Sequence, residues 1–299
     1  MDSAHPAPPA HPAKPPLTRY QPRPVPPLPL CGQTRAHPGA GYRALIEAIV
    51  PGPAVAVDTR EDCGEEPLPG EAERVERAVP ARRAEFATGR ACARHALARL
   101  GLPPRPIPTG QRGEPSWPHG VVGSITHCAG YRGAVLARTS QIATIGIDAE
   151  PNAALPAGVL DSISLPGERA WVGQLSAAHP AVHWDRLLFC AKESVYKAWF
   201  PLAHRWLDFQ DAAVTVQDEP GTGWAGGSDG GSGAQPFAAS GRFTAALRVA
   251  GPDVRGRELS AFTGRWAVRE GLILTAIVVS HQHPSPGCRP IHENLTMAG

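Results

Sequence analysis

Two short stretches of the sequence carry side chains that could do chemistry. IGIDAE at 145–150 separates Asp148 from Glu150 by one residue, so in a β-strand both carboxylates point to the same face. FCAKESVYKAWF at 189–200 separates Glu193 from Lys197 by one helical turn, so in a helix both project from one side. Carboxylate oxygens suit Mg²⁺ or Mn²⁺, and magnesium usually bridges carboxylates to substrate phosphates. If the helix packs over the strand, the pattern indicates metal-assisted phosphate chemistry.

Each pair also has a simpler interpretation. A Glu and a Lys four residues apart form a common solvent-facing helix pair worth about 0.3–0.5 kcal/mol. Two carboxylates on an exposed strand edge repel each other only weakly, so they need no metal ion. Which interpretation holds depends on whether the 189–200 segment meets the 145–150 segment in the folded chain.

Basic residues and a histidine supply the second candidate group. RRAEFATGRACARHAL at 82–97 predicts a helix on which Arg83 and Arg90 share a face that Arg82 can also reach. We weigh a solvated face and an anion-binding face equally. His127 ends the predicted strand GVVGSITHC at 120–128, where a buried histidine, a metal ligand and a phosphate contact are all open. Its neighbour Cys128 points the opposite way on a strand, which disfavours a Cys–His nucleophile pair.

The hydrophobic patterning predicts a mixed fold of the α+β class. Two segments, 81–104 and 184–207, have helical patterns, the first with Gly101 and Pro103 as stop signals and the second ending before or near Pro201. Strands are predicted at 120–128, 132–140, 142–150, 211–217, 242–249 and 271–280, with 132–140 and 142–150 paired as a hairpin. Each half of the chain has one long helix and several strands, which permits two similar α+β lobes.

Composition divides the 299 residues into parts that can and cannot build a core. Residues 1–36 are rich in proline and poor in large aliphatic side chains, so we predict a disordered tail there. A Gly- and Ser-rich stretch at 219–237 predicts a flexible loop, and residues 281–299 a second disordered tail. The remainder is predicted to contain an N-terminal lobe at 37–149 and a C-terminal lobe at 150–280.

Charge, cysteine content and hydropathy argue against several classes of protein. Lys and Arg number 29 against 27 Asp and Glu, a formal net charge of +2 that gives no electrostatic case for nucleic-acid binding. The six cysteines form no CxxC pair, which disfavours a zinc site or a disulfide framework and fits reduced thiols in the cytoplasm. No apolar signal segment begins the chain, and the longest aliphatic run, 271–279, is too short to cross a membrane. We therefore expect a cytoplasmic protein without a membrane partner.

In chain order, GSITHC, IGIDAE and FCAKESVYK resemble the three signature regions of the 4′-phosphopantetheinyl transferases of the single-chain Sfp/EntD type. The similarity covers about residues 37–280 and is closest to the actinobacterial EntD-like branch. The resemblance implies two similar α+β lobes that form a pseudo-dimer within a monomer. It also implies an enzyme that moves 4′-phosphopantetheine from coenzyme A (CoA) to a serine of apo acyl or peptidyl carrier proteins, releasing adenosine 3′,5′-bisphosphate. Such enzymes activate fatty-acid, polyketide, nonribosomal-peptide and siderophore synthases.

The resemblance also implies roles for individual residues. The oxygen ligands of Mg²⁺, or of Mn²⁺ as the alternative, would be Asp148, the Ala149 carbonyl, Glu150 and Glu193. Glu193 would complete the metal shell or accept the serine proton, and Lys197 would offset charge on the CoA pyrophosphate. Candidates for the other phosphates of CoA are Arg82 or Arg83, Arg90, Arg112, Thr126 and His127. Between the first two, the family register favours Arg82 and the helix face favours Arg83.

Two other functions fit the same residues. A metal-dependent phosphodiesterase or nuclease also places carboxylates and a lysine around a metal ion, although the charge balance disfavours a nucleic-acid substrate. A non-catalytic module that docks carrier proteins would need no metal ion. Incubation with Mg²⁺, CoA and an apo carrier separates the three, because only a transferase produces a pantetheinylated carrier.

Overall fold

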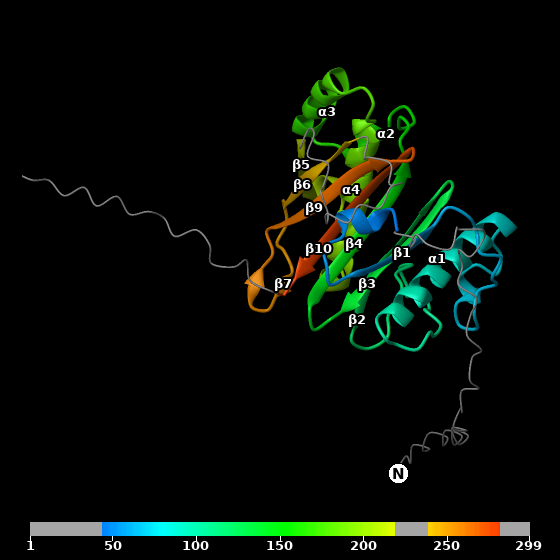
Figure 1. Cartoon of the computed structure of the whole chain (residues 1–299). Helices are drawn as coiled ribbons and strands as arrows, with labels where there is room; N and C mark the ends of the chain where they lie inside the picture. The colour runs from blue at the N-terminus through cyan, green and yellow to red at the C-terminus, as the bar shows by residue number, and fades with distance from the viewer. Residues whose placement is uncertain (1–43, 219–238, 282–299) are drawn as a thin grey trace, which may run out of the picture. The chain divides into compact units, whose positions relative to one another are not determined.

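Two antiparallel sheets and two long helices make up most of this computed structural model, which describes residues 44–218 and 239–281 (Figure 1). The first sheet has the strand order β1 (Val55–Thr59), β3 (Tyr131–Arg138), β2 (Val121–Cys128). The second has the order β4 (Ile142–Pro151), β10 (Leu272–Ser280), β9 (Ala261–Arg269), β6 (Ala239–Leu247), β5 (Ala212–Asp218). A small ribbon pairs β7 (Asp253–Val254) with β8 (Arg257–Glu258). The predicted α+β class is confirmed.

The two long helices are α1 (Pro80–Arg99) and α4 (Trp184–Ala203), close to their predicted positions. Helix α1 ends where Gly101 adopts a positive φ of 72°, and α4 ends at Ala203, two residues after Pro201. The shorter helices are α2 (Val159–Ile163) and α3 (Pro166–Ala178), with 3-10 turns at η1 (Ile46–Ile49), η2 (Ala72–Arg74) and η3 (Phe209–Asp211). The prediction omitted α2, α3, β1 and β9, and the short strands β7 and β8.

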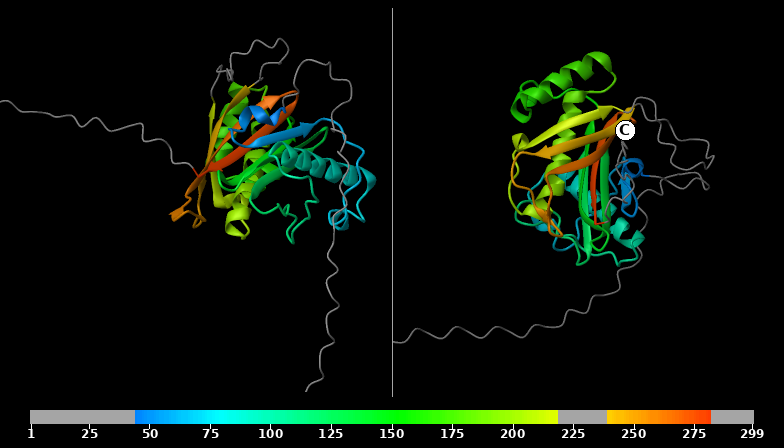
Figure 2. Two further views of the ribbon diagram at one scale, coloured as in Figure 1. Left: turned by 60° about the horizontal axis from the view of Figure 1, so that its bottom comes forward. Right: turned by 90° about the vertical axis from the view of Figure 1, so that its left-hand side faces the viewer.

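The elements form four layers in the order α1, first sheet, second sheet, α4 (Figure 2). Successive side chains of β3 point to opposite faces of the first sheet. Leu136 packs against α1, whereas Val135 points into the core between the sheets. On the second sheet, Ile147 of β4 shares that inter-sheet core, and the opposite face packs against α4 through residues such as Phe243 and Trp266. Both sheets are therefore buried on two faces near β4.

The predicted hairpin between 132–140 and 142–150 is wrong. Strand β3 lies in the centre of the first sheet, where β1 occupies one edge and β2 the other, so no edge remains for β4. Strand β4 instead pairs with β10 of the second sheet. It still contacts β2, because Ser124 and Thr126 of β2 accept hydrogen bonds from the backbone N–H groups of Ile147 and Ala149. The segment with the two acidic residues thus lies where the two sheets meet.

A buried ion pair fixes α4 in its layer. Lys192 Nζ lies 2.8 Å from Glu168 Oε2 of α3 and donates to the carbonyls of Phe209 and Ala212, at 2.6 and 3.0 Å. Glu168 in turn accepts the backbone N–H groups at the start of α3 and in β5. Each N–H donor of the Lys192 ammonium group has a partner, so the positive charge of Lys192 can remain buried. The network joins α3, α4 and β5 into one unit.

Some sequence predictions lie wholly or largely outside the described residues. These are the disordered tail at 1–36, the flexible loop at 219–237 and all but the first residue of the tail at 281–299. The lobe boundary between residues 149 and 150 stays a prediction. The four cysteines at described positions, Cys63, Cys92, Cys128 and Cys190, are free thiols. Within the described ranges, no helix has the length and apolar character needed to cross a bilayer.

Candidate active site

The predicted meeting of helix and strand takes place at Gly146 of β4. A Cβ atom at this position would collide with the carbonyl oxygen of Ser194 and would lie 2.7 Å from the backbone nitrogen of Ala198. Only a residue without a side chain therefore lets α4 approach so closely. Thr144, two residues earlier on the same face, donates a 2.7 Å hydrogen bond to the carbonyl of Ala198. This close contact directs the face of α4 that carries Glu193 and Lys197 toward the acidic end of β4.

Asp148 is the centre of the acidic group. It is buried, and its Oδ1 accepts hydrogen bonds from Lys197 Nζ at 2.6 Å and from the Thr126 hydroxyl at 3.0 Å. Its other oxygen, Oδ2, is buried without a hydrogen-bond partner among the described residues. Although burial acts to lower the pKa of Lys197, the neighbouring Asp148 raises it above its ordinary value. Lys197 is therefore a cation at neutral pH.

Glu150 and Glu193 complete a set of three carboxylates. Burial raises the pKa of Glu150, and Asp148 raises it further, against the opposing effect of Arg186. Burial also raises the pKa of Glu193, which Lys197 partly opposes and to which Asp148 and Glu150 both add. A carboxylate raises the pKa of another in this way when the two lie close together. The structure therefore brings Asp148, Glu150 and Glu193 into one electrostatic neighbourhood.

A hard divalent cation fits this donor set. The unpartnered Oδ2 of Asp148 offers an oxygen ligand, and a cation would relieve the repulsion among the three carboxylates. The described part of the chain contains no group of three His, Cys, Asp or Glu side chains already arranged to hold a metal ion. Two of the three carboxylates instead form ion pairs: Glu150 with Arg186 at 2.9 Å and Asp148 with Lys197 at 2.6 Å. The predicted ligand set, with the Ala149 carbonyl, stays a prediction.

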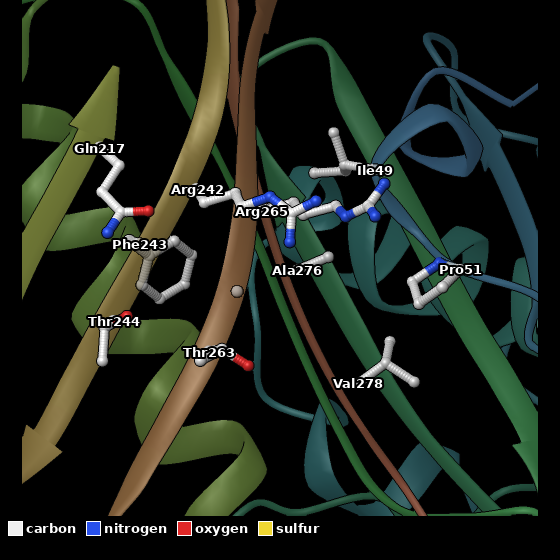
Figure 3. A pocket seen from close by; sticks show the side chains of 11 residues that line it. Ile49, Pro51, Gln217, Arg242, Phe243, Thr244, Thr263, Arg265, Ala276 and Val278 are labelled. Atoms are coloured by element: carbon white, nitrogen blue, oxygen red, sulfur yellow. The ribbon is translucent and has the colours of Figure 1, made fainter. Parts of the chain in front are cut away.

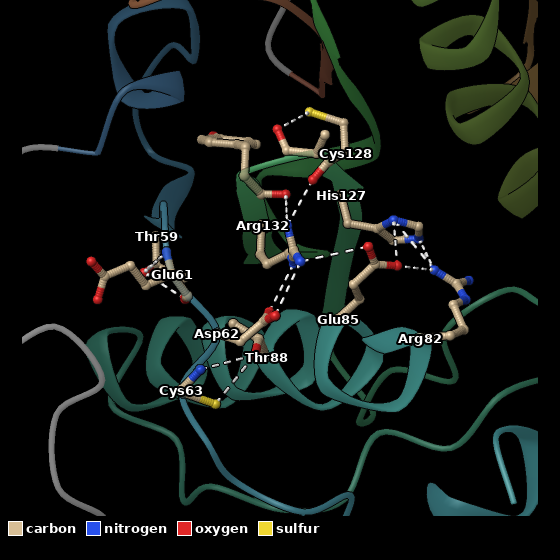
Figure 4. Close-up of polar contacts among 12 residues, drawn as sticks. Thr59, Glu61, Asp62, Cys63, Arg82, Glu85, Thr88, His127, Cys128 and Arg132 are labelled. Carbon is tan, nitrogen blue, oxygen red and sulfur yellow. Dashed lines mark hydrogen bonds and ion pairs between the residues drawn. The ribbon is translucent and has the colours of Figure 1, made fainter. Parts of the chain in front are cut away.

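A second polar cluster lies where the start of α1 meets the end of β2 (Figure 4). Arg82 Nη1 is 2.7 Å from His127 Nε2, and Glu85 Oε2 accepts from the same guanidinium group at 3.2 Å. The other oxygen of Glu85 lies 3.5 Å from Arg132, which also pairs with Asp62 at 3.0 Å. Glu85 therefore lies between the guanidinium groups of Arg82 and Arg132 and contacts both. This cluster contains Arg82 and not Arg83, which pairs with Glu66.

His127 and Cys128 at the end of β2 are both uncharged at neutral pH. Burial, together with the cation of Arg82, lowers the pKa of His127 to about 4. Burial raises the pKa of the Cys128 thiol to about 12, and the carboxylates of Glu150 and Asp148 add to that rise. A neutral imidazole can donate one hydrogen bond to an anion, whereas a protonated thiol is a poor nucleophile. The structure thus supports the rejection of a Cys–His pair.

The pKa of His127 predicts a pH effect on stability. The folded-state pKa of about 4 lies below the ordinary value of 6.5, so between these values the unfolded chain binds a proton that the folded chain does not. Stability from this group is therefore present above pH 6.5 and is lost as the pH falls toward 4. We expect His127→Gln to lose less free energy of unfolding than the wild type between pH 7 and pH 4.5 in urea titrations. Equal losses in the two proteins would contradict the lowered pKa.

The remaining predicted site residues lie in three different settings. Arg90 is buried and donates to the Ile107 carbonyl and the Thr109 hydroxyl, and burial lowers its pKa to about 10. These hydrogen bonds tie Arg90 to the 105–115 loop, and its contact with a CoA phosphate stays a prediction. Arg112 is exposed on that loop, 5.9 Å from the centre of the Phe200 ring of α4. Thr126 is buried, and its hydroxyl joins β2 to β4.

Comparison with known proteins places this arrangement in a family. The family model described as the 4′-phosphopantetheinyl transferase N-terminal domain matches residues 70–137, and that of the 4′-phosphopantetheinyl transferase superfamily matches residues 144–226. The chain is 52% identical over 240 residues to the 4′-phosphopantetheinyl transferase Svp of Streptomyces mobaraensis. These residues are 79% of this chain and 89% of that protein. The chain belongs to the 4′-phosphopantetheinyl transferase family.

Two further phosphopantetheinyl transferases agree with this assignment. PptT of Mycobacterium tuberculosis is 52% identical over 213 residues, which are 71% of this chain and 86% of that protein. Npt of Nocardia iowensis is 46% identical over 237 residues, 78% of this chain and 99% of that protein. The resemblance found in the three motifs is confirmed, and the chain is an enzyme of the transferase class.

Several residues that shape the site of this phosphopantetheinyl transferase were not predicted from the sequence. Arg186 could have been found, because it lies seven residues before Glu193 on the same helix face. Glu85 lies three residues after Arg82 and so faces the same side of α1. Gly146, a single glycine inside a strand pattern, is a known sign of a close approach by another backbone.

A depression of about 310 Å³ on the second sheet is separate from the candidate active site (Figure 3). It is lined by Arg242 and Thr244 of β6, Thr263 and Arg265 of β9, and Ile49 of η1. Trp266, the residue next to Arg265, points into the core beneath α4, so by alternation Arg265 points to the opposite face of the sheet. None of the predicted site residues lines this depression.

Proposed function

We propose that this phosphopantetheinyl transferase moves the 4′-phosphopantetheine arm of CoA to a serine hydroxyl of apo acyl or peptidyl carrier proteins, in a Mg²⁺-dependent reaction that releases adenosine 3′,5′-bisphosphate. The observation that carries the proposal is the 2.6 Å contact between Lys197 Nζ and Asp148 Oδ1. This contact joins the helix motif to the strand motif, and Glu193 and Glu150 lie in the same charged neighbourhood. We further propose a cytoplasmic monomer that serves fatty-acid, polyketide or nonribosomal-peptide synthases.

Three carboxylates are proposed as metal ligands: those of Asp148, Glu150 and Glu193, with the Ala149 carbonyl as a further oxygen. When bound, Mg²⁺, or Mn²⁺ as the alternative, would neutralise negative charge on the CoA pyrophosphate. The buried Oδ2 of Asp148 supports this assignment, because a hard cation would satisfy an oxygen that has no other partner among the described residues. Arg186 would then keep Glu150 in place at the rim of the site.

Glu193 is proposed either to complete the metal shell or to act as the base that accepts the serine proton. Its raised pKa makes it a stronger proton acceptor than an ordinary glutamate. As the serine oxygen bonds to the phosphorus that carries the pantetheine arm, the bond from that phosphorus to the bridging pyrophosphate oxygen breaks. Lys197 would stabilise the charge that develops on the departing phosphate, because its ammonium group lies beside the acidic end of β4.

The basic residues are proposed to bind the nucleotide end of CoA. Arg82 and His127 present a guanidinium group and a neutral imidazole at one place, a combination that suits a phosphate monoester. Arg112 would meet a phosphate from the exposed loop beside Phe200 of α4. Arg90 and Thr126 stay candidates for contacts to a CoA phosphate, and their hydrogen bonds also support the 105–115 loop and the contact between β2 and β4.

A mass measurement tests this proposal. The purified chain is incubated with Mg²⁺, CoA and an apo carrier protein, and the carrier is followed by intact-mass spectrometry. We expect the mass of the carrier to increase by one phosphopantetheine group, and the increase to disappear when EDTA is added. An unchanged carrier together with cleaved nucleic acid in a parallel incubation would favour the nuclease alternative and contradict the proposal.

A further inference from the structure

The depression on the second sheet has an arginine on each of two paired strands. Arg242 of β6 lies directly opposite Arg265 of β9 in the antiparallel register, so both side chains project from the same face. Both residues line the depression, and in Figure 3 both side chains extend toward Ile49. Like charges that face each other across two strands repel. An oxyanion between the two guanidinium groups would be attracted to both, because each presents a planar fork of N–H donors.

Neutral hydrogen-bonding groups lie beside the two arginines on the same face. Thr244 pairs with Thr263 in the same ladder, two residues from each arginine, and both threonines line the depression. The side-chain amide of Gln217 lies opposite Arg242 on the neighbouring strand β5. Hydroxyl and amide groups can donate further hydrogen bonds to an oxyanion. None of the lining residues within the described ranges is Asp or Glu, so their side chains are neutral or positively charged.

The shape of the depression suits a small ligand. Its volume of about 310 Å³ lies at the lower end of the range for small-molecule sites. Ile49 and Pro51 line the side opposite Gln217 with apolar surface (Figure 3). Arg265 is half-buried, whereas Arg242 is exposed. Salt screens a partly buried charge less than an exposed one, so Arg265 would act more strongly on a bound anion than an arginine on open surface.

We propose that this depression binds a phosphate group, either as inorganic phosphate or as part of a small organic molecule. Arg242 and Arg265 hold the phosphate oxygens through charge-assisted hydrogen bonds, and the hydroxyls of Thr244 and Thr263 donate to them from the next position of the ladder. This site does not depend on the proposed transfer reaction, because none of the residues proposed to bind CoA or the metal ion lines the depression. It lies on the face of the second sheet that is turned away from α4.

Titration calorimetry with inorganic phosphate tests the site in the purified chain, without CoA or carrier, at an ionic strength of about 0.15 M. We expect Arg242→Gln/Arg265→Gln to weaken phosphate binding by at least about tenfold, because two charge-assisted contacts are lost. Arg255→Gln/Arg257→Gln removes the same charge from the exposed end of the β7–β8 ribbon. This matched control should bind phosphate as the wild type does. Urea unfolding of both double variants verifies that the fold is retained.

Arg82→Gln separates this site from the proposed CoA site, which would also attract phosphate. A wild type that binds two phosphates, of which Arg82→Gln and Arg242→Gln/Arg265→Gln each lose one, supports the proposal. Loss of all phosphate binding in Arg82→Gln, with full binding in Arg242→Gln/Arg265→Gln, would overturn it, because the ion would then lie at the CoA site. Equal binding in all the proteins, or none in the wild type, would also overturn it.

A parallel titration with glycerol 3-phosphate distinguishes the two sources of the phosphate group. Tighter binding of glycerol 3-phosphate, lost in Arg242→Gln/Arg265→Gln, indicates a small organic phosphate as the ligand. Tighter binding of inorganic phosphate, lost in the same variant, indicates the free ion. If neither ligand distinguishes the wild type from this variant, the depression is not a phosphate site.

Discussion

Replacing Asp148 with Asn is expected to lower kcat/KM for phosphopantetheinyl transfer by about a hundredfold or more. The amide nearly preserves the shape of the side chain and its hydrogen bond from the Thr126 hydroxyl, but it removes the negative charge that pairs with Lys197 and is available to a metal ion. Loss of one preorganised charged group in an active site typically costs about a hundred- to a thousandfold in rate. The measurement is the initial rate of holo-carrier formation at several Mg²⁺ concentrations.

Asp161→Asn is the matched control for this experiment. Asp161 is an exposed carboxylate on α2, so the same chemical change there should leave kcat/KM unaltered. Asp148→Ala should be at least as damaging as Asp148→Asn, because it also removes the contact to Thr126. If Asp148→Asn kept more than about a tenth of the wild-type rate, Asp148 would not be a principal ligand or charge partner in the reaction.

Gly146→Ala is expected to weaken both the fold and the activity. The added methyl group would collide with the backbone of α4 at Ser194 and Ala198, and backbone atoms cannot rotate away as a side chain can. We expect a loss of about 1–3 kcal/mol or more in the free energy of unfolding, the usual cost of overpacking. Because α4 would move away from β4, Glu193 and Lys197 would be displaced from Asp148, and kcat/KM should fall about a hundredfold, the scale of a displacement near 1 Å.

Gly173→Ala provides the opposite case in the same protein. Gly173 lies in the exposed face of α3, and a Cβ there would meet no atom within 4 Å. The substitution should therefore raise the free energy of unfolding by about 0.5–1 kcal/mol, as expected for alanine in a helix, without any change in transfer rate. Urea unfolding and carrier assays on both variants make the comparison. A Gly146→Ala protein with wild-type stability would show that α4 does not lie against β4 as closely as the structure has it.

The error about the hairpin shows what local patterning leaves open. Segments 132–140 and 142–150 are both apolar, adjacent and separated by a turn, and these are the marks of paired strands. The pairing is instead decided by β1, which comes from residues 55–59 and takes the edge of β3 that a hairpin would have used. Because β1 is far away in the sequence, no property of the two segments themselves could have revealed this competition.

The choice between Arg82 and Arg83 has a similar origin. Helical spacing places Arg83 on the same stripe as Arg90, and on α1 alone that reasoning is sound. In the folded chain Arg90 is buried against the 105–115 loop, and the end of β2 brings His127 to Arg82. The partner that selects one arginine belongs to another element, so periodicity on the helix could not identify it.

The sequence by itself determined the family, the fold class and the side chains with which the enzyme would work, because residue type and spacing set which groups share a face of a strand or a helix. Asp148 with Glu150, and Glu193 with Lys197, follow from spacing alone. Only the tertiary structure decided which faces meet. The absence of a side chain at Gly146 lets α4 cross β4, so Lys197 reaches Asp148 and Arg186 reaches Glu150. Contacts of this kind depend on the packing of layers distant in the chain, which spacing within one element does not specify.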